Sequence, residues 1–253
     1  MYPILFKVGG FAVSSYSAML LVAFLTSYYL SAREFRRKGL DDSLRDYFLV
    51  ACVVGGLVGA KILFLAENVS LREFLDDPFR YLSSGLTFLG GFIGALILIW
   101  VVARLNDLSF LYVCDTISPL VVLSYAIGRI GCFLVGDDYG PPSDLPWAMA
   151  FPKGSPPTTE RVHPTQIYDF LVLTFLFAFL WKIRKRQKPT GWLFGLTLFL
   201  LGVERFIIEY WRVTTPSFIP GVSVAQLMSL FVAAAGAVLV VTRSLCGSQV
   251  HRG

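Results

Sequence analysis

The sequence predicts an all-α, polytopic membrane protein with about seven transmembrane helices and a small extracytoplasmic head. Hydrophobic residues make up 55% of the 253 positions and charged residues only 15%, whereas a soluble domain carries about 25% charged residues. The mean hydropathy is +0.66. Apolar runs of the length that crosses a bilayer, about 20 residues, recur along the whole chain.

Seven segments are predicted to span the membrane: 11–32, 47–66, 81–103, 115–135, 166–181, 191–210 and 222–242. The first run does not resemble a cleaved signal peptide, because a basic cluster at 33–38 follows it in place of a small-residue cleavage site. No internal repeat interrupts the pattern. Residues 1–253 are therefore expected to form one transmembrane domain.

Basic residues predict the orientation of these spans. With the N-terminus outside, the cytoplasmic segments hold 13 Lys and Arg residues and the outer segments six, and the other three lie within spans. Cytoplasmic loops of membrane proteins carry the excess of positive charge. The prediction is a multi-pass membrane protein with its N-terminus outside and its C-terminus inside.

The segment 136–165 is the least membrane-like part of the chain. It contains seven prolines, which a regular helix cannot accommodate. The positive-inside pattern places it on the outer side. It is expected to form the extracytoplasmic head within the single domain.

Ionisable side chains inside predicted spans are costly, roughly 2.5–3.5 kcal/mol each at a helix centre. Those that need a partner or a polar cavity include Lys61, Arg129, Glu204, Arg205 and Glu209. One interpretation is intramembrane ion pairing, such as Arg129 with Glu204 or Glu209. The other is a polar cavity that binds an anion, for which a phospholipid headgroup is the obvious candidate, because Arg grips phosphate with two parallel hydrogen bonds.

The stretch Gly128 to Gly140 is the most informative in the chain. It reads Gly-Arg-Ile-Gly-Cys-Phe-Leu-Val-Gly-Asp-Asp-Tyr-Gly and places Arg129, then Asp137 and Asp138, at the outer end of a span. Its glycines allow close helix approach and a tight turn. A glycine-rich helix end with a solvated acidic turn is the alternative interpretation.

The remaining composition predicts no metal site and no organic cofactor. The four cysteines, which include Cys132, form no CxxC pair, and the two histidines, His163 and His251, lie too far apart for a local metal motif. The net charge of +5 is interpreted as a topology signal, so no nucleic-acid partner is expected.

Seven motifs in order resemble those of the prolipoprotein diacylglyceryl transferase family. The stretch from Gly128 follows the spacing of that family's G-R-x-G-N-F-x-N-x-E-x-x-G signature, with Cys132 and Val135 for its asparagines and Asp137 for its glutamate. The other similar segments are Tyr16 in the first span, 59–61 for Gly-Gly-Arg, 146–152 for P-x-A-M-x-F-P, 163–169 for H-P-[ST]-Q-L-Y-E, 205–212 for R-x-x-x-E-F-x-R, and 224–226 for M-G-Q.

The resemblance implies a reaction and its partners. The family moves the diacylglyceryl group of phosphatidylglycerol to the lipobox cysteine of a preprolipoprotein signal peptide, and glycerol phosphate leaves. Arg129 and Arg205 are then expected to bind the phosphate and offset its developing charge. Glu209 would orient Arg205 or Arg212, and Arg212, nearer the surface, could steer lipid or peptide.

Further roles follow from the same resemblance. Asp137 would stand in for the family's glutamate, Tyr16 and Gln166 would hydrogen-bond around the headgroup, and Lys61 would take the place of an arginine. Tyr16 can also be interpreted as an interfacial aromatic anchor. Lys61 can equally be a packed residue whose amine snorkels outward.

Two departures from the family pattern bear on the chemistry. Leu89 stands where the family has a histidine to which a central catalytic role is commonly given, and Cys132 replaces the signature asparagine. His163 could serve as the base if the head folds over the cavity, or it could be structural. Cys132 could be a covalent nucleophile or a small buried hydrophobic residue.

These departures leave two alternative functions open. One is a divergent phospholipid-dependent transferase or lipase-like enzyme with a different acceptor. The other is a non-enzymatic lipid transporter, which the lack of an internal repeat disfavours.

Overall fold

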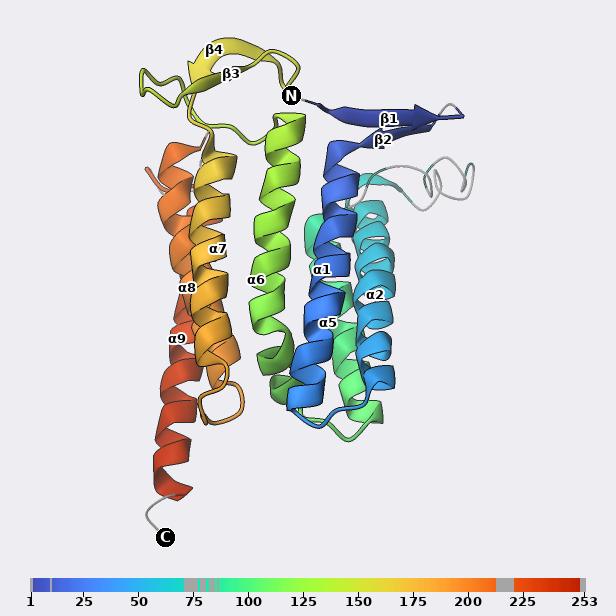
Figure 1. Ribbon diagram of the computed structural model, residues 1–253, viewed down its shortest axis with the longest axis vertical. Helices are drawn as coiled ribbons and strands as arrows, with labels where there is room; N and C mark the ends of the chain where they lie inside the picture. The colour runs from blue at the N-terminus through green and yellow to red at the C-terminus, as the bar shows by residue number, and fades with distance from the viewer. Residues whose placement is uncertain are drawn as a thin grey trace. The chain divides into compact units, whose positions relative to one another are not determined.

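The computed structural model describes residues 2–9, 11–70, 77, 81, 85, 87–212 and 221–250 (Figure 1). Its helices are α1 (Ser15–Arg37), α2 (Asp42–Asn68), α5 (Phe88–Leu105), α6 (Phe110–Val135), α7 (Thr165–Ile183), α8 (Trp192–Ile208) with the 3-10 turn η1 (Glu209–Trp211), and α9 (Val224–Val250). Two antiparallel hairpins join β1 (Ile4–Val8) to β2 (Phe11–Ser14) and β3 (Met149–Phe151) to β4 (Thr158–Val162).

The helices confirm an all-α membrane protein. Five are long and apolar enough to cross a bilayer by length and composition: Ser15–Arg37, Asp42–Asn68, Phe110–Val135, Thr165–Ile183 and Val224–Cys246. The apolar stretch Gly90–Leu105 is shorter, and α8 has 17 residues. Each of these seven helices overlaps one of the seven predicted segments.

The start of the first predicted span is wrong. Residues 11–14 form β2, which pairs with β1 so that Val8 lies opposite Phe11. Gly9 takes a φ of 53° in the turn between them, a conformation that glycine reaches without steric cost. The apolar character of 11–14 concealed a strand, because a short apolar run does not distinguish strand from helix.

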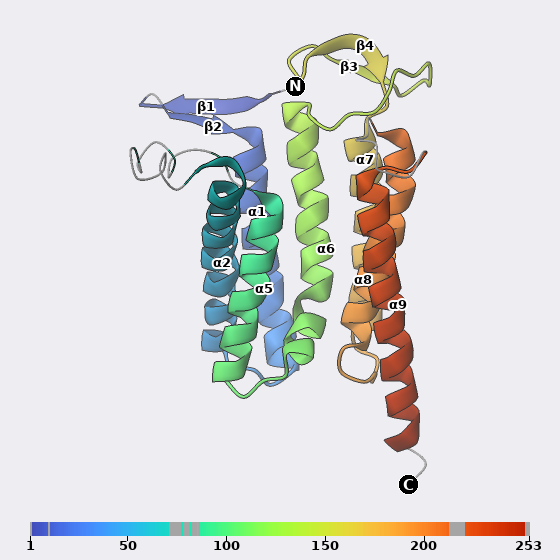
Figure 2. The same ribbon diagram turned by 180° about the vertical axis from the view of Figure 1, so that it is seen from behind.

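The chain divides into two compact units, residues 1–30 with 114–253 and residues 31–113, which are described separately. In the second unit, α2 and α5 lie side by side (Figures 1 and 2). Gly55 and Gly59 of α2 meet Gly94 and Gly90 of α5, and a Cβ atom on any of the four would lie 2.5 Å or less from a facing carbonyl oxygen. Such GxxxG spacing on both helices lets their backbones touch.

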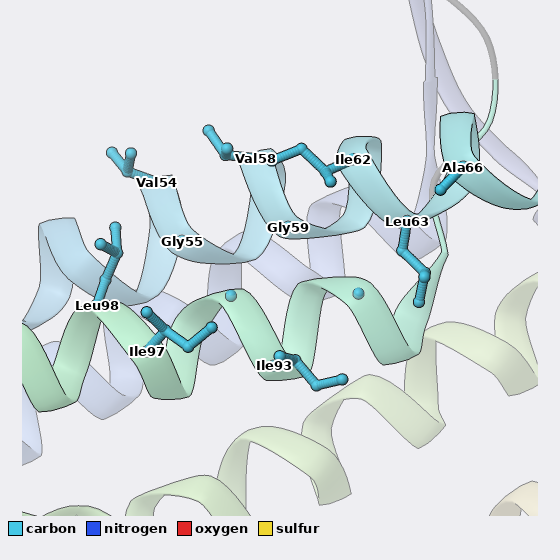
Figure 3. A pocket seen from close by; sticks show the side chains of 12 residues that line it. Val54, Gly55, Val58, Gly59, Ile62, Leu63, Ala66, Ile93, Ile97 and Leu98 are labelled. Atoms are coloured by element: carbon cyan, nitrogen blue, oxygen red, sulfur yellow. The ribbon is translucent and has the colours of Figure 1, made fainter. Parts of the chain in front are cut away.

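The close backbone approach leaves an apolar groove of about 400 Å³ between α2 and α5. Figure 3 shows Val54, Val58 and Ile62 on one side of it and Ile93 and Ile97 on the other. None of its lining residues is ionisable. The groove therefore offers shape and apolar surface but no acid–base chemistry.

In the first unit, the core lies between α6, α7 and α8. Fully or almost fully buried side chains fill it: Val122, Ala126, Leu173, Leu176, Leu180, Ile183 and Leu193. Helix α9 packs on α8 (Figure 2), where Gly202 faces Ser229 and Ala233, and Gly236 faces Phe199. Small residues thus bring these helices together as they do α2 and α5.

One buried carboxylate joins α6 to the start of α8. Asp115 accepts hydrogen bonds from the backbone N–H groups of Gly191, at 2.6 Å, and Phe194, at 2.7 Å. The first N–H groups of a helix have no partner within it, and the helix dipole favours an anion there. Asp115 therefore caps α8 from a neighbouring helix.

The segment 136–165 contains no regular helix, as its prolines predict, and carries the β3–β4 hairpin above the ends of α6 and α7 (Figure 1). Phe151 is buried and stacks on Tyr139, with ring centroids 5.3 Å apart. Gly140 packs so tightly against Trp211 and His163 that a Cβ would lie 2.1 Å from the Trp211 carbonyl oxygen. These contacts hold the segment against the ends of the helices.

Candidate functional site

Six ionisable residues of the first unit form one network of charges. They lie at the C-terminal end of α6 and just after it, near the N-terminal end of α7, and at the end of α8 with η1 and the residue that follows. We call this network the arginine–carboxylate cluster, and its members are Arg129, Arg205, Arg212, Asp138, Asp169 and Glu209.

Arg129 lies at the centre of the cluster, with its side chain 6% exposed. Its Nη1 is 3.0 Å from an oxygen of Asp138, and its Nη2 is 2.6 Å from an oxygen of the fully buried Asp169. Pairing with two carboxylates offsets the cost of burying a guanidinium. The expected partners Glu204 and Glu209 were wrong, because α6 turns Arg129 toward α7 and the head.

Arg212 engages the same two carboxylates. Its Nη2 is 2.7 Å from Asp138, and its Nη1 is 3.8 Å from Asp169. Arg129 and Arg212 are 83 positions apart in the chain, yet they share an inner carboxylate, Asp169, and an outer one, Asp138. Two guanidinium groups thus converge on the same acceptors.

Arg205 joins the cluster through Glu209. The two side chains form an ion pair of 2.8 Å one turn apart, and Glu209 also lies 3.9 Å from Arg212. Arg205 is the most exposed of the three arginines, at 28%. Among the described residues, Arg129 and Arg205 share no carboxylate, so the two predicted phosphate ligands occupy opposite ends of one network.

The start of α9 holds Glu209 in place. The Ser223 hydroxyl donates to Glu209 at 3.1 Å and accepts from the backbone N–H of Gln226, whose side-chain oxygen accepts from the Ser223 N–H. This reciprocal arrangement is a capping box. The segment that resembles the family's last motif therefore positions an acid of the cluster.

The neighbouring carboxylates Asp137 and Asp138 differ in their electrostatics. Burial raises the pKa of Asp137, and the charge of Asp138 acts in the same direction. Burial acts to raise the pKa of Asp138 as well, but the charges of Arg212 and Arg129 and their hydrogen bonds outweigh it and hold that pKa below its usual range. Asp138 is therefore the firmly ionised member of the pair.

Gln166 and Tyr16 lie beside the same turn. Gln166 is fully buried, donates from Nε2 to the backbone oxygen of Asp137, and has an Oε1 atom without a hydrogen-bond partner in the described part of the chain. Tyr16 packs against Gly131 of α6 and is 44% exposed. Both predicted headgroup contacts are thus near Asp137 and Cys132.

His163 makes a hydrogen bond from the head to the first turn of α7. Its Nδ1 is 3.1 Å from the hydroxyl of Tyr168, which also accepts from Trp147 Nε1 at 2.8 Å. The His163 backbone pairs with Gly140 and Pro141. These contacts support the structural interpretation of His163, and its role as a base stays a prediction.

Cys132 is 8% exposed, and its sulfur lies 3.5 Å from Arg129 Nη1. The sulfur and the carboxylates of Asp137 and Asp138 come within 4.8 Å of one another, as the ligands of a metal do. Both Asp138 oxygens, however, already face guanidinium groups, and these positive charges repel a cation. Asp138 therefore belongs to the arginine–carboxylate cluster, and Cys132 and Asp137 lie beside it.

Lys61 belongs to the other unit. Its amine donates to the backbone oxygens of Tyr81, at 3.2 Å, and Gly85, at 2.8 Å, and lies 5.3 Å from the centre of the Phe64 ring. It therefore anchors the segment before α5, and its role in substrate binding stays a prediction. Leu89 lies in α5, and its side chain is outside the described part.

Sequence reasoning missed three residues of this site. Asp169 and Asp138 carry the ion pairs of Arg129, and Ser223 holds Glu209. Asp169 had a detectable signal, since it is an acid inside the predicted span 166–181. Asp138 stood out as an acid close to Arg129 in the stretch from Gly128 to Gly140, although no role was assigned to it, whereas Ser223 carried no such signal.

Comparisons with known proteins point to one family. The family model described as prolipoprotein diacylglyceryl transferase matches residues 3–242. A phosphatidylglycerol–prolipoprotein diacylglyceryl transferase of Clostridium tetani is 32% identical over 239 residues, which cover 91% of this chain and 93% of that protein. Its namesakes in Bordetella avium, 33% identical over 94% and 93% of the two chains, and Azotobacter vinelandii, 35% identical over 83% and 81%, are similar.

Helices long and apolar enough to cross a membrane, together with a network of arginines and carboxylates in the first unit, define a helical membrane protein with a charged site. The length and identity of the matches narrow this class further. The chain belongs to the prolipoprotein diacylglyceryl transferase family.

Proposed function

We propose that this protein transfers the diacylglyceryl group of phosphatidylglycerol to the lipobox cysteine of a preprolipoprotein. The names of its relatives support both substrates. The observation that carries the proposal is the convergence of Arg129 and Arg212 on one exposed carboxylate, that of Asp138. A pair of guanidiniums that already holds a carboxylate can hold a phosphate, which suits the same bidentate geometry.

The reaction first requires that the site stabilise the leaving group. The cysteine sulfur attacks a glyceryl carbon, a carbon–sulfur bond forms, and the carbon–oxygen bond to phosphate breaks with its electron pair going to glycerol phosphate. The leaving phosphate must be stabilised, and three arginines in a site of low exposure do this. Buried Asp169 and Glu209 orient those arginines.

The thiol proton also needs an acceptor, because the thiolate is the nucleophile. Asp137 is the candidate: one of its carboxylate oxygens is buried with no hydrogen-bond partner among the described residues, and its raised pKa favours holding a proton. His163 is the second candidate. The buried Oε1 of Gln166 has no hydrogen-bond partner among the described residues and can accept a hydrogen bond from a hydroxyl of the headgroup.

We place the site in the outer leaflet of a bacterial inner membrane. In this topology the seven helices span, residues 136–165 form the extracytoplasmic head of a single domain, the N-terminus lies outside and the C-terminus inside. The excess of 13 over six basic residues in the segments between spans supports it. The cluster then lies where a headgroup and an exported signal peptide can meet.

The test is transfer by the purified protein from phosphatidylglycerol to a lipobox peptide, followed by mass spectrometry of the peptide. A diacylglyceryl thioether on cysteine is the expected product. Arg129→Ala, Arg205→Ala and Arg212→Ala should each lower the rate per folded molecule by about 100-fold or more, with the folded fraction in detergent measured for each variant. Asp144→Asn, a head residue outside the cluster, should leave the rate unchanged.

Two other outcomes would assign one of the alternative functions. Turnover of the lipid without modification of the peptide would indicate a transferase or lipase-like enzyme with another acceptor. Intact lipid moved between leaflets of a vesicle, without any turnover, would indicate a transporter.

A further inference from the structure

We propose that Asp138 is an internal counter-anion, which occupies the place between Arg129 and Arg212 that the phosphate of the lipid takes on binding. The inference rests on the proposed function and adds to it a residue that sets affinity for the headgroup. Asp138 lies at one of the unassigned positions of the family signature, so the resemblance gives it no role.

The geometry of the carboxylate is that of a bridging anion. One oxygen of Asp138 is 3.0 Å from Arg129 Nη1, and the other is 2.7 Å from Arg212 Nη2. A phosphate offers two oxygens with similar reach, and guanidiniums bind both kinds of anion in the same way. The site is therefore already arranged around one anion at this point.

Exposure distinguishes the two carboxylates that the arginines share. Asp169 is fully buried, whereas the Asp138 side chain is 45% exposed. The arginines themselves are only 6% and 12% exposed. An incoming anion can therefore reach the arginines from the Asp138 side, while Asp169 keeps them oriented from within.

The backbone around Asp138 is fastened independently of its side chain. The Asp138 carbonyl accepts from the Thr165 hydroxyl at 2.6 Å, and the Gly136 carbonyl accepts from the Ser155 N–H at 2.9 Å. The carboxylate can leave the arginines by side-chain rotation alone. Asp138 also has a φ of 59°, which is uncommon for residues other than glycine, so its presence there is not required by the turn.

The experiment measures the affinity of the purified full-length protein for glycerol phosphate by calorimetry at low ionic strength. Asp138→Asn should bind about tenfold more tightly than the wild type, because a competing charge is gone. Asp138→Gly, which suits the backbone conformation, should do the same and serves if the first variant does not fold. Thermal unfolding in the same detergent establishes which variants are folded.

Two matched variants separate competition from general electrostatics. Asp137→Asn removes the same charge one residue away, from a carboxylate that bridges no arginines, and should give a clearly smaller gain. Asp144→Asn should give none. Equal gains for Asp137→Asn and Asp138→Asn, or unchanged or weaker binding in both Asp138 variants, would overturn the proposal.

The source of the phosphate is distinguished by repeating the titration with inorganic phosphate and with phosphatidylglycerol in nanodiscs. Tighter binding of all three supports competition for phosphate as such, and a gain confined to the two glyceryl ligands supports a site specific for the headgroup. Transfer to the peptide is assayed separately. If the wild type makes the thioether but the Asp138 variants do not bind glycerol phosphate more tightly, only the role of Asp138 as a counter-anion is refuted. If those variants bind more tightly but the wild type makes no thioether, only the transferase function is refuted.

Discussion

The guanidinium of Arg129 lies 2.6 Å from the carboxylate of Asp169, and both side chains are almost completely removed from solvent. The pair joins α6 to α7 at the level where the head begins. A charge on either residue alone at this depth would be costly. The pair therefore links the stability of the fold to the position of the central arginine of the site.

Asp169→Ala should destabilise the protein by roughly 3–5 kcal/mol, because it leaves the buried Arg129 with only Asp138. Asp169→Asn keeps the shape and a hydrogen-bond acceptor and should be milder. The measurement is unfolding in detergent, with Asp144→Asn as the exposed control, which should change stability by less than about 0.5 kcal/mol. A stable Asp169→Ala protein would show that the pair does not support the fold.

Asp115→Ala should lower stability by about 2 kcal/mol, since two backbone N–H groups at the start of α8 lose their acceptor. The transfer rate per folded molecule should be unchanged, because 14 residues of helix, about 21 Å, separate Asp115 from Arg129. Stability and rate are measured on the same preparation. A loss of rate without a loss of stability would contradict a purely structural role for Asp115.

Cys132→Ala should keep the transfer rate to within about threefold, because the buried sulfur is a weak acceptor 3.5 Å from Arg129, and Asp138 and Asp169 still hold that guanidinium. The rate assay is combined with intact-mass measurement of the enzyme during turnover. Loss of activity together with a glyceryl adduct on the wild-type protein would instead show covalent catalysis through this cysteine.

The adjacent carboxylates should respond oppositely to pH. Asp138, whose pKa is lowered, stabilises the fold above the ordinary aspartate pKa of about 3.9, and this contribution is lost as pH falls through its folded pKa. Asp137, whose pKa is raised, contributes at acid pH and loses that contribution as pH rises through about 3.9 to its higher folded pKa.

At pH 7, Asp138→Asn should therefore lower the unfolding temperature, and Asp137→Asn should raise it. The Asp137→Asn difference should shrink as the pH falls from 7 to about 3.9, and the Asp138→Asn difference should shrink only as the pH falls below about 3.9. The measurement is thermal unfolding of the three proteins across that range. Shifts of the same sign at pH 7 would show that the environments of the two groups are not as different as their contacts indicate.

Much of the fold could be predicted from sequence, and the failures have local causes. All seven predicted segments contain a helix, since apolar runs of this length have few other structures available in a membrane. The β1–β2 hairpin was missed because Phe11–Ser14 is as apolar as the helix that follows. Nothing in the periodicity of 136–165 predicted the pairing of β3 with β4.

The motifs indicated which residues lie near Arg129 better than they indicated which ion pairs these residues form. Asp137, Gln166 and Cys132 lie together near Arg129, as the motifs suggested, whereas Lys61 belongs to the other unit. The ion pairs came out differently: Arg129 meets Asp138 and Asp169, and Glu209 meets Arg205 and Arg212. Ser223, the residue that holds Glu209, carried no signal in the sequence.

The sequence by itself determined the membrane class, the helical segments and the family, because hydropathy and motif order are properties of consecutive residues. Only the tertiary structure decided which carboxylate faces which arginine. That choice depends on the rotation of each helix about its axis and on the path of the head, which are set by packing between residues far apart in the chain. For that reason Asp138 and Asp169 contact Arg212 as well as Arg129, although neither is close to Arg212 in sequence.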